Sequence, residues 1–135
     1  MSLFSDYPRI LRLFLVLVAI HSILVGICLI VSPVSFIEYL GFPMKEKFYA
    51  VQGGVFHLVV SVAYLMAAKD IKAGKNLVEF SFIAKFMATV FLFTYYFAVN
   101  PIFLVLFSGL GDLIMGLIIY RLYWLVWKRE SQPVQ

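Results

Sequence analysis

The sequence predicts an all-α integral membrane protein: a four-helix antiparallel bundle with both termini cytoplasmic. Of its 135 residues, 64% are hydrophobic and 13% are charged, and the mean hydropathy is +1.00. Soluble domains are nearer half apolar and a quarter charged. The apolar residues form four continuous runs, each near the ~20 residues that a helix needs to cross a bilayer. A membrane β-barrel is excluded because apolar and polar residues do not alternate along these runs.

The four predicted spans follow one another within a single transmembrane domain, residues 1–135. The first ends before Pro33, which lacks a backbone donor and restricts the residue before it. The third ends at Asn100–Pro101, a very tight turn, and the link between the second and third spans is the polar turn 69–76. Such short links predict that the helices they join are antiparallel neighbours. The spans cover about residues 10–32, 49–68, 77–99 and 102–124.

The connection at 34–47 is long enough for a short amphipathic segment between the first two spans. We expect its apolar side chains to lie on the membrane surface while its charged side chains face water. The apolar set is Phe36, Ile37, Leu40 and Phe42, and the charged set is Glu38, Lys45, Glu46 and Lys47.

Basic residues predict the orientation in the membrane, because cytoplasmic loops carry an excess of lysine and arginine. Lys45 and Lys47 are the two basic residues on one side of the predicted topology, whereas the other side has eight. This asymmetry places both termini in the cytoplasm and the protein in an inner (plasma) membrane. The eight are Arg9, Arg12, Lys69, Lys72, Lys75, Arg121, Lys128 and Arg129.

Each span carries one ionisable residue near its middle: His21, His57, Lys85 and Asp112 in chain order. At a rise of about 1.5 Å per residue, all four fall within the central third of a hydrocarbon core about 30 Å thick. Ionisable residues at this depth usually face the bundle interior, pair with one another and mark a functional site. Lys85 and Asp112 are the expected ion pair, which could also serve only to fix the helix register.

Small and polar residues share a helix face with three of these four residues and extend the candidate site. Tyr64 lies seven residues after His57, and Tyr96 lies further along the helix of Lys85. The candidate ligand-binding residues are His21, His57, Tyr64, Lys85, Tyr96 and Asp112. A pocket with a few convergent polar groups predicts a lipophilic ligand such as a quinone, a sterol-like compound or an acyl chain.

Other functions remain open at this stage. An accessory or scaffold subunit of a larger membrane complex, and a homo-oligomer, fit the aromatic-rich helices equally well. Two histidines at matching depth allow haem, and His21, His57 and Asp112 offer metal ligands, but a Lys–Asp pair would crowd a haem and no tight spacing such as H-x-x-x-H supports a metal. A nucleic-acid partner has no support, because the net charge of +4 is spread over loops and tails.

Three stretches of the chain share a pattern of small residues: "HSILVGICLIVSPVSFIEYLGFP", "VQGGVFHLVVSVAYLMAA" after it, and "GDLIMG" in the last span. On these stretches the chain resembles the DoxX-like group of small four-helix bacterial membrane proteins. The resemblance implies a four-helix bundle and a quinone-linked redox role or a membrane-accessory role. It assigns no catalytic residue to this chain.

Overall fold

The protein is all-helical throughout its described part. The structure, a computed structural model, describes residues 6–130, and the side chains of residues 6–127. Its helices are α1 (Tyr7–Val31), α2 (Val34–Tyr39), α3 (Phe48–Lys69), α4 (Lys75–Ala98) and α5 (Phe103–Glu130), and no strand occurs between residues 6 and 130. All but α2 are long and apolar enough to cross a membrane. The helical class and the four long apolar helices are thus confirmed, whereas the ends of the predicted domain, 1–5 and 131–135, lie outside the described residues.

The helix bounds differ most from the predicted spans at the end of α5. This helix continues to Glu130, beyond the predicted end at residue 124, because neither glycine nor proline occurs between residue 124 and Pro133. The side chains of Lys128 and Arg129, used in the topology prediction, lie outside the described part. Within 34–47 only Val34–Tyr39 is helical, and of the four apolar side chains expected at the membrane surface Ile37 is instead buried.

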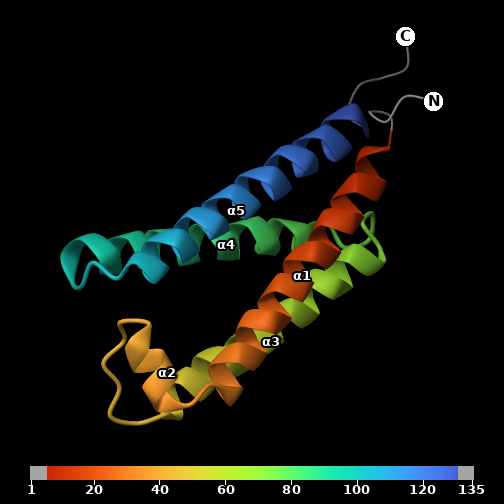
Figure 1. Ribbon diagram of the computed structural model, residues 1–135. Helices are drawn as coiled ribbons and strands as arrows, with labels where there is room; N and C mark the ends of the chain where they lie inside the picture. The colour runs from red at the N-terminus through yellow and green to blue at the C-terminus, as the bar shows by residue number, and fades with distance from the viewer. Residues whose placement is uncertain (1–5, 131–135) are drawn as a thin grey trace.

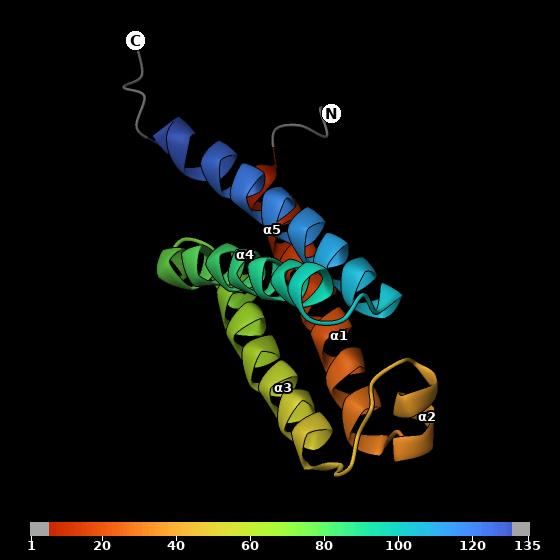
Figure 2. The same ribbon diagram turned by 90° about the vertical axis from the view of Figure 1, so that its left-hand side faces the viewer.

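The four long helices form two pairs rather than an even bundle. α1 packs along α3 and α4 packs along α5, while the contacts between the two pairs are far fewer. Figure 1 and Figure 2 both show α3 and α4 meeting at the turn that joins them and then diverging. These two helices are thus in contact near their common turn and not along their whole length. A short link brings helix ends together, but it does not fix the angle at which the helices leave it.

The two pairs join at one end through a single apolar core. This end holds the start of α1, the end of α5 and the turn between α3 and α4 (Figure 1). Tyr64 is 2% exposed there and is the largest fully buried side chain in the described part. All four long helices contribute to this core, which consists of Leu11, Leu15, Val18, Ala19, Tyr64, Ala67, Ala68, Ile71, Val78, Ile119 and Val126.

Glycines keep each pair of helices together beyond this core. A Cβ atom added to Gly54 would lie 2.6 Å from the carbonyl oxygen of Gly26, so α1 and α3 touch backbone to backbone. In the other pair, a Cβ atom on Gly109 would lie 2.7 Å from the Phe93 ring. Small residues permit such close approach, which favours helix association in membranes. Close helix contacts of this kind thus lie within each pair.

Candidate functional site

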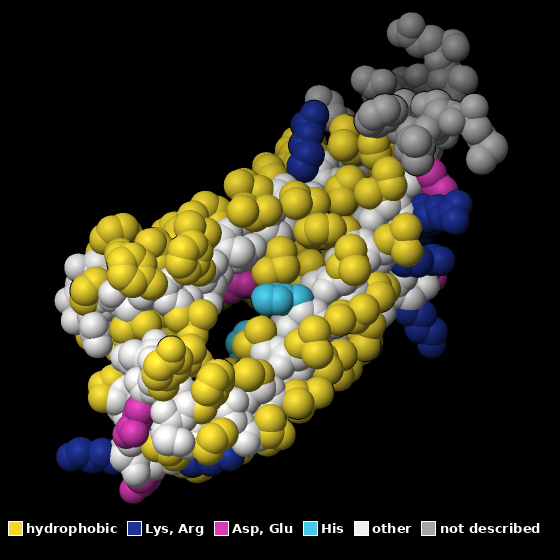
Figure 3. Space-filling view, in the orientation of Figure 1, with side chains coloured by type: hydrophobic (Ala, Val, Ile, Leu, Met, Phe, Trp, Pro, Cys, Tyr) yellow, Lys and Arg dark blue, Asp and Glu magenta, His cyan; other side chains and the backbone are white. Residues whose placement is uncertain are grey.

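A cavity lies where the two helix pairs begin to diverge, directly beside the apolar core. Its volume is about 150 Å³. Figure 3 shows a hollow between the pairs, with histidine and acidic side chains at its wall. All four long helices line the cavity, through Ser22, Phe56, His57, Val60, Tyr64, Ala84, Lys85, Ala88 and Asp112.

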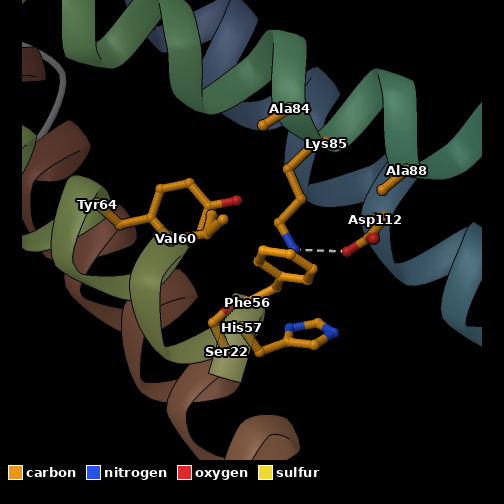
Figure 4. Close-up of a pocket in the computed structure, with 9 residues that line it drawn as sticks. All are labelled: Ser22, Phe56, His57, Val60, Tyr64, Ala84, Lys85, Ala88 and Asp112. Atoms are coloured by element: carbon orange, nitrogen blue, oxygen red, sulfur yellow. Dashed lines mark hydrogen bonds and ion pairs between the residues drawn. The ribbon is translucent and has the colours of Figure 1, made fainter. Parts of the chain in front are cut away.

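Lys85 and Asp112 form the expected ion pair inside this cavity. Lys85 Nζ donates to Asp112 Oδ1 at 2.5 Å, and the two side chains are 4% and 13% exposed. The contact joins α4 to α5 (Figure 4). Because the desolvation of two charges offsets much of their attraction, such a pair adds little net stability. Removing one partner is a different matter, since it leaves the other charge buried and uncompensated.

The position of Lys85 depends on a glycine one turn from Asp112. A Cβ atom on Gly116 would lie 3.2 Å from Lys85 Cβ, so the missing side chain lets the lysine stem approach α5. The stem then spans one helical turn, about 5.4 Å, to reach the carboxylate. Thr89 lies one turn after Lys85 on α4, and its hydroxyl donates to the backbone carbonyl of Lys85 at 2.9 Å. The local sequence thus directs the ammonium group along α5 and into the cavity.

Helix α3 supplies the opposite wall. Phe56, Val60 and Tyr64 recur every four residues and therefore lie on one face of the helix, with His57 beside them. The Tyr64 ring lies 5.8 Å from Lys85 Nζ, within the range of a cation–π contact. Figure 4 shows the Tyr64 hydroxyl pointing toward the side of Lys85 and the imidazole of His57 lying on the side of Asp112. This contact of Lys85 with the Tyr64 ring connects the two helix pairs.

Two of the six sequence-predicted residues do not line the cavity. His21 is exposed, because the buried face of α1 follows Leu15, Val18 and Ser22 and His21 is rotated about 100° from Ser22. Tyr96 packs its ring on Phe97, with the centroids 5.1 Å apart. It is eleven residues beyond Lys85, about 17 Å along the axis, so it shares the correct face but lies outside the cavity. His57, Tyr64, Lys85 and Asp112 are the predicted residues that the cavity brings together.

Five residues outside the sequence-predicted set complete the wall. Ser22 continues the small-residue spacing that leads to Gly26, a signal for the inward face of α1. Ala84 and Ala88 are one turn apart on α4, and their small side chains leave the space that the cavity occupies. No comparable signal marks the remaining two, Phe56 and Val60, in a helix that is apolar on all sides.

The cavity does not suit the two cofactor alternatives. An apolar protein cavity of about 150 Å³ holds a benzene ring, which is far smaller than a haem macrocycle. Lys85 also projects into the space that a macrocycle would need. Among the described residues, no three His, Cys, Asp or Glu side chains come together as metal ligands do. His21, the remaining ligand of the metal alternative, is not among the residues that line the cavity.

The cavity combines one ring-sized space with hydrogen-bonding groups of both kinds. A lysine ammonium has three donors, and within residues 6–127 its one hydrogen bond is to Asp112. The Tyr64 hydroxyl and the His57 imidazole each donate and accept. Such a set can orient a small polar headgroup and exchange a proton with it. No protein-family model, curated protein or solved structure matches this chain.

Proposed function

We propose that this chain binds a lipophilic small molecule, such as a quinone or a lipid, at the polar layer in the middle of its membrane spans. The observation that carries the proposal is the cavity itself: about 150 Å³, lined by an ion pair, an imidazole and a phenol at mid-depth between apolar helices. Ligand sites combine an apolar wall with a few convergent polar groups in this way. A quinone ligand would associate the site with redox chemistry, as the resemblance to the DoxX-like group also implies.

The proposal includes the placement of the chain in an inner (plasma) membrane as an antiparallel bundle with cytoplasmic termini. The joined end of the two helix pairs is then the cytoplasmic end. Its support is the distribution of charge, because the basic residues of α1, the 70–74 turn and α5 lie toward this end, whereas Lys45 and Lys47 lie in the loop before α3. Figure 3 shows most of the visible lysine and arginine side chains beside the start of α1.

The alternative, a non-catalytic accessory or scaffold subunit, predicts a tightly packed centre. A scaffold gains nothing from charged groups facing an open space, and a cavity between helices loses packing contacts. The cavity beside Lys85 and Asp112 therefore supports the binding function over the scaffold function. A partner complex remains the outcome to expect if the protein proves to hold no molecule other than bulk lipid.

Native mass spectrometry of the full chain, purified in mild detergent from its membranes, tests the binding function. We expect a bound small molecule on the wild type that is lost from His57→Ala and Asp112→Asn. Tyr64→Phe, which removes a single hydroxyl, should lower its occupancy. Met87→Leu is the matched control, because Met87 is 69% exposed and points to lipid. Wild-type protein that carries only the phospholipids also found on His57→Ala would refute the proposal.

A further inference from the structure

The charge balance of the cavity restricts the ligand that the proposed function allows. Lys85 and Asp112 carry opposite charges and pair directly, and the histidines count as neutral at pH 7. The net charge of the walls is therefore zero. An ionised headgroup would bring a charge with no counter-ion into the middle of the membrane, where uncompensated charge is strongly disfavoured. An uncharged headgroup avoids this penalty.

The polar atoms of the wall restrict the headgroup further. Two of the three Lys85 donors form no hydrogen bond within the described residues, and the Tyr64 hydroxyl and His57 imidazole are free to donate as well. Several donors thus face the cavity without a partner, and the acceptors that are left are chiefly on Asp112, which receives one hydrogen bond from Lys85. A headgroup with a carbonyl or amide oxygen satisfies these donors, whereas a pure hydrocarbon leaves them unpaired.

The shape of the cavity restricts the size of the headgroup and its access route. A space of about 150 Å³ accommodates about one six-membered ring. Small side chains at Ala84 and Ala88 on α4 face the α3 wall (Figure 4), and Figure 3 shows that the surface is hollowed between the two helix pairs. An apolar tail attached to the ring can therefore leave between these two helices toward the lipid.

From these three restrictions we propose that the site takes an uncharged, single-ring headgroup with a hydrogen-bond-accepting oxygen, which enters from the bilayer between α3 and α4. This inference rests on the proposed function and defines its ligand class. It assigns Ala88 as a residue that determines access, since a larger side chain there fills the space between the helices without touching the ion pair.

A matched series of tritiated probes tests the headgroup class, using the full chain reconstituted in phosphatidylcholine nanodiscs. The probes are para-dodecylbenzamide, para-dodecylbenzoate and dodecylbenzene, which share the ring and the tail. We expect saturable binding of the benzamide, at least about tenfold weaker binding of the ionised benzoate, and the hydrocarbon at the level of empty nanodiscs. Benzoate binding as tight as benzamide binding, or no saturable benzamide binding, overturns the inference.

Variants test the access route and separate this inference from the proposed function. Ala88→Phe should weaken benzamide binding at least about tenfold, while Met87→Phe, one residue away and facing lipid, should bind as the wild type does. Both must elute from size exclusion and melt as the wild type does. If Ala88→Phe is misfolded, Ala88→Leu takes its place, and unchanged benzamide binding in a folded variant overturns the route. A co-purified anionic molecule lost from His57→Ala would overturn the headgroup class and leave the binding function standing.

Discussion

The buried ion pair makes the sharpest prediction for stability. Asp112→Asn keeps the size of the side chain and removes its charge. Lys85, whose side chain is 4% exposed, then has no counter-ion among the described residues. The neighbouring charges are too far along the helices to replace Asp112, and the Tyr64 ring offers only a cation–π contact.

The expected loss follows from two independent scales. Breaking a buried ion pair by removing one partner typically costs about 3–5 kcal/mol, and a lysine at the centre of a membrane helix costs about 2.5–3.5 kcal/mol on insertion scales. The asparagine oxygen can still accept one hydrogen bond, which recovers roughly 1 kcal/mol. We therefore expect Asp112→Asn to lower the free energy of unfolding by about 3 kcal/mol, or roughly 100-fold in the unfolding equilibrium constant.

Replacing both charges should leave the free energy of unfolding nearly unchanged. The double variant Lys85→Met with Asp112→Leu leaves no charge to compensate, and apolar replacements of buried pairs are often neutral or stabilising. We expect its free energy of unfolding to lie within about 1 kcal/mol of the wild-type value. The assay is reversible unfolding by dodecyl sulfate in mixed micelles, followed by far-ultraviolet circular dichroism.

A matched control makes the same chemical change at the surface. Glu46→Gln, in the exposed loop before α3, should unfold as the wild type does. The reasoning is refuted if Asp112→Asn also unfolds at the wild-type dodecyl sulfate fraction, or if the double variant is as unstable as Asp112→Asn. The first result would mean that Lys85 reaches water or another partner once the Asp112 charge is gone. The second result would mean that the geometry of the pair, not its charge, stabilises α4 against α5.

Two further predictions concern helix packing and topology. Gly54→Ala should destabilise the protein by about 1–3 kcal/mol, because its Cβ atom would lie 2.6 Å from a carbonyl oxygen of α1. Gly53→Ala is the control and should be neutral, since its Cβ atom would meet nothing closer than 3.8 Å. Equal thermal stability of the two variants would contradict the backbone contact. The topology is tested with single cysteines in a Cys28→Ser background and a membrane-impermeant maleimide. Lys72→Cys should react only in inverted vesicles, and Lys45→Cys should react only in right-side-out cells. The reverse pattern would overturn the cytoplasmic placement of the termini.

Much of the fold follows from the sequence because the bilayer sets the length of each span. Pro33 and Asn100–Pro101 mark helix ends that the structure repeats within a few residues. The depth of Lys85 and Asp112 follows from counting residues, and two opposite charges at one depth on helices joined by a tight turn have few other partners. Their pairing could therefore be derived without coordinates.

The rotation of each helix could not be derived so easily. In water, apolar residues mark the buried face, but here Leu15 is fully buried while Leu17 is 60% exposed to the membrane region. Both faces of α1 are apolar, so only small and polar residues indicate the interior. His21 and Ser22 are adjacent in α1, and only Ser22 belongs to the buried face that continues to Gly26. An ionisable residue alone therefore does not predict the rotation of this helix.

The place of the ion pair within the fold argues for its role. A pair that served to hold the whole molecule together would connect the two helix pairs, which touch least. Instead it joins α4 to α5, two helices already in close contact at Gly109 and Gly116, where another link adds little. Its polar atoms face the opening toward His57 and Tyr64 instead. These charged groups contribute little to packing, yet they border a cavity that a molecule could enter from the bilayer. They are better explained by what they bind than by what they hold together.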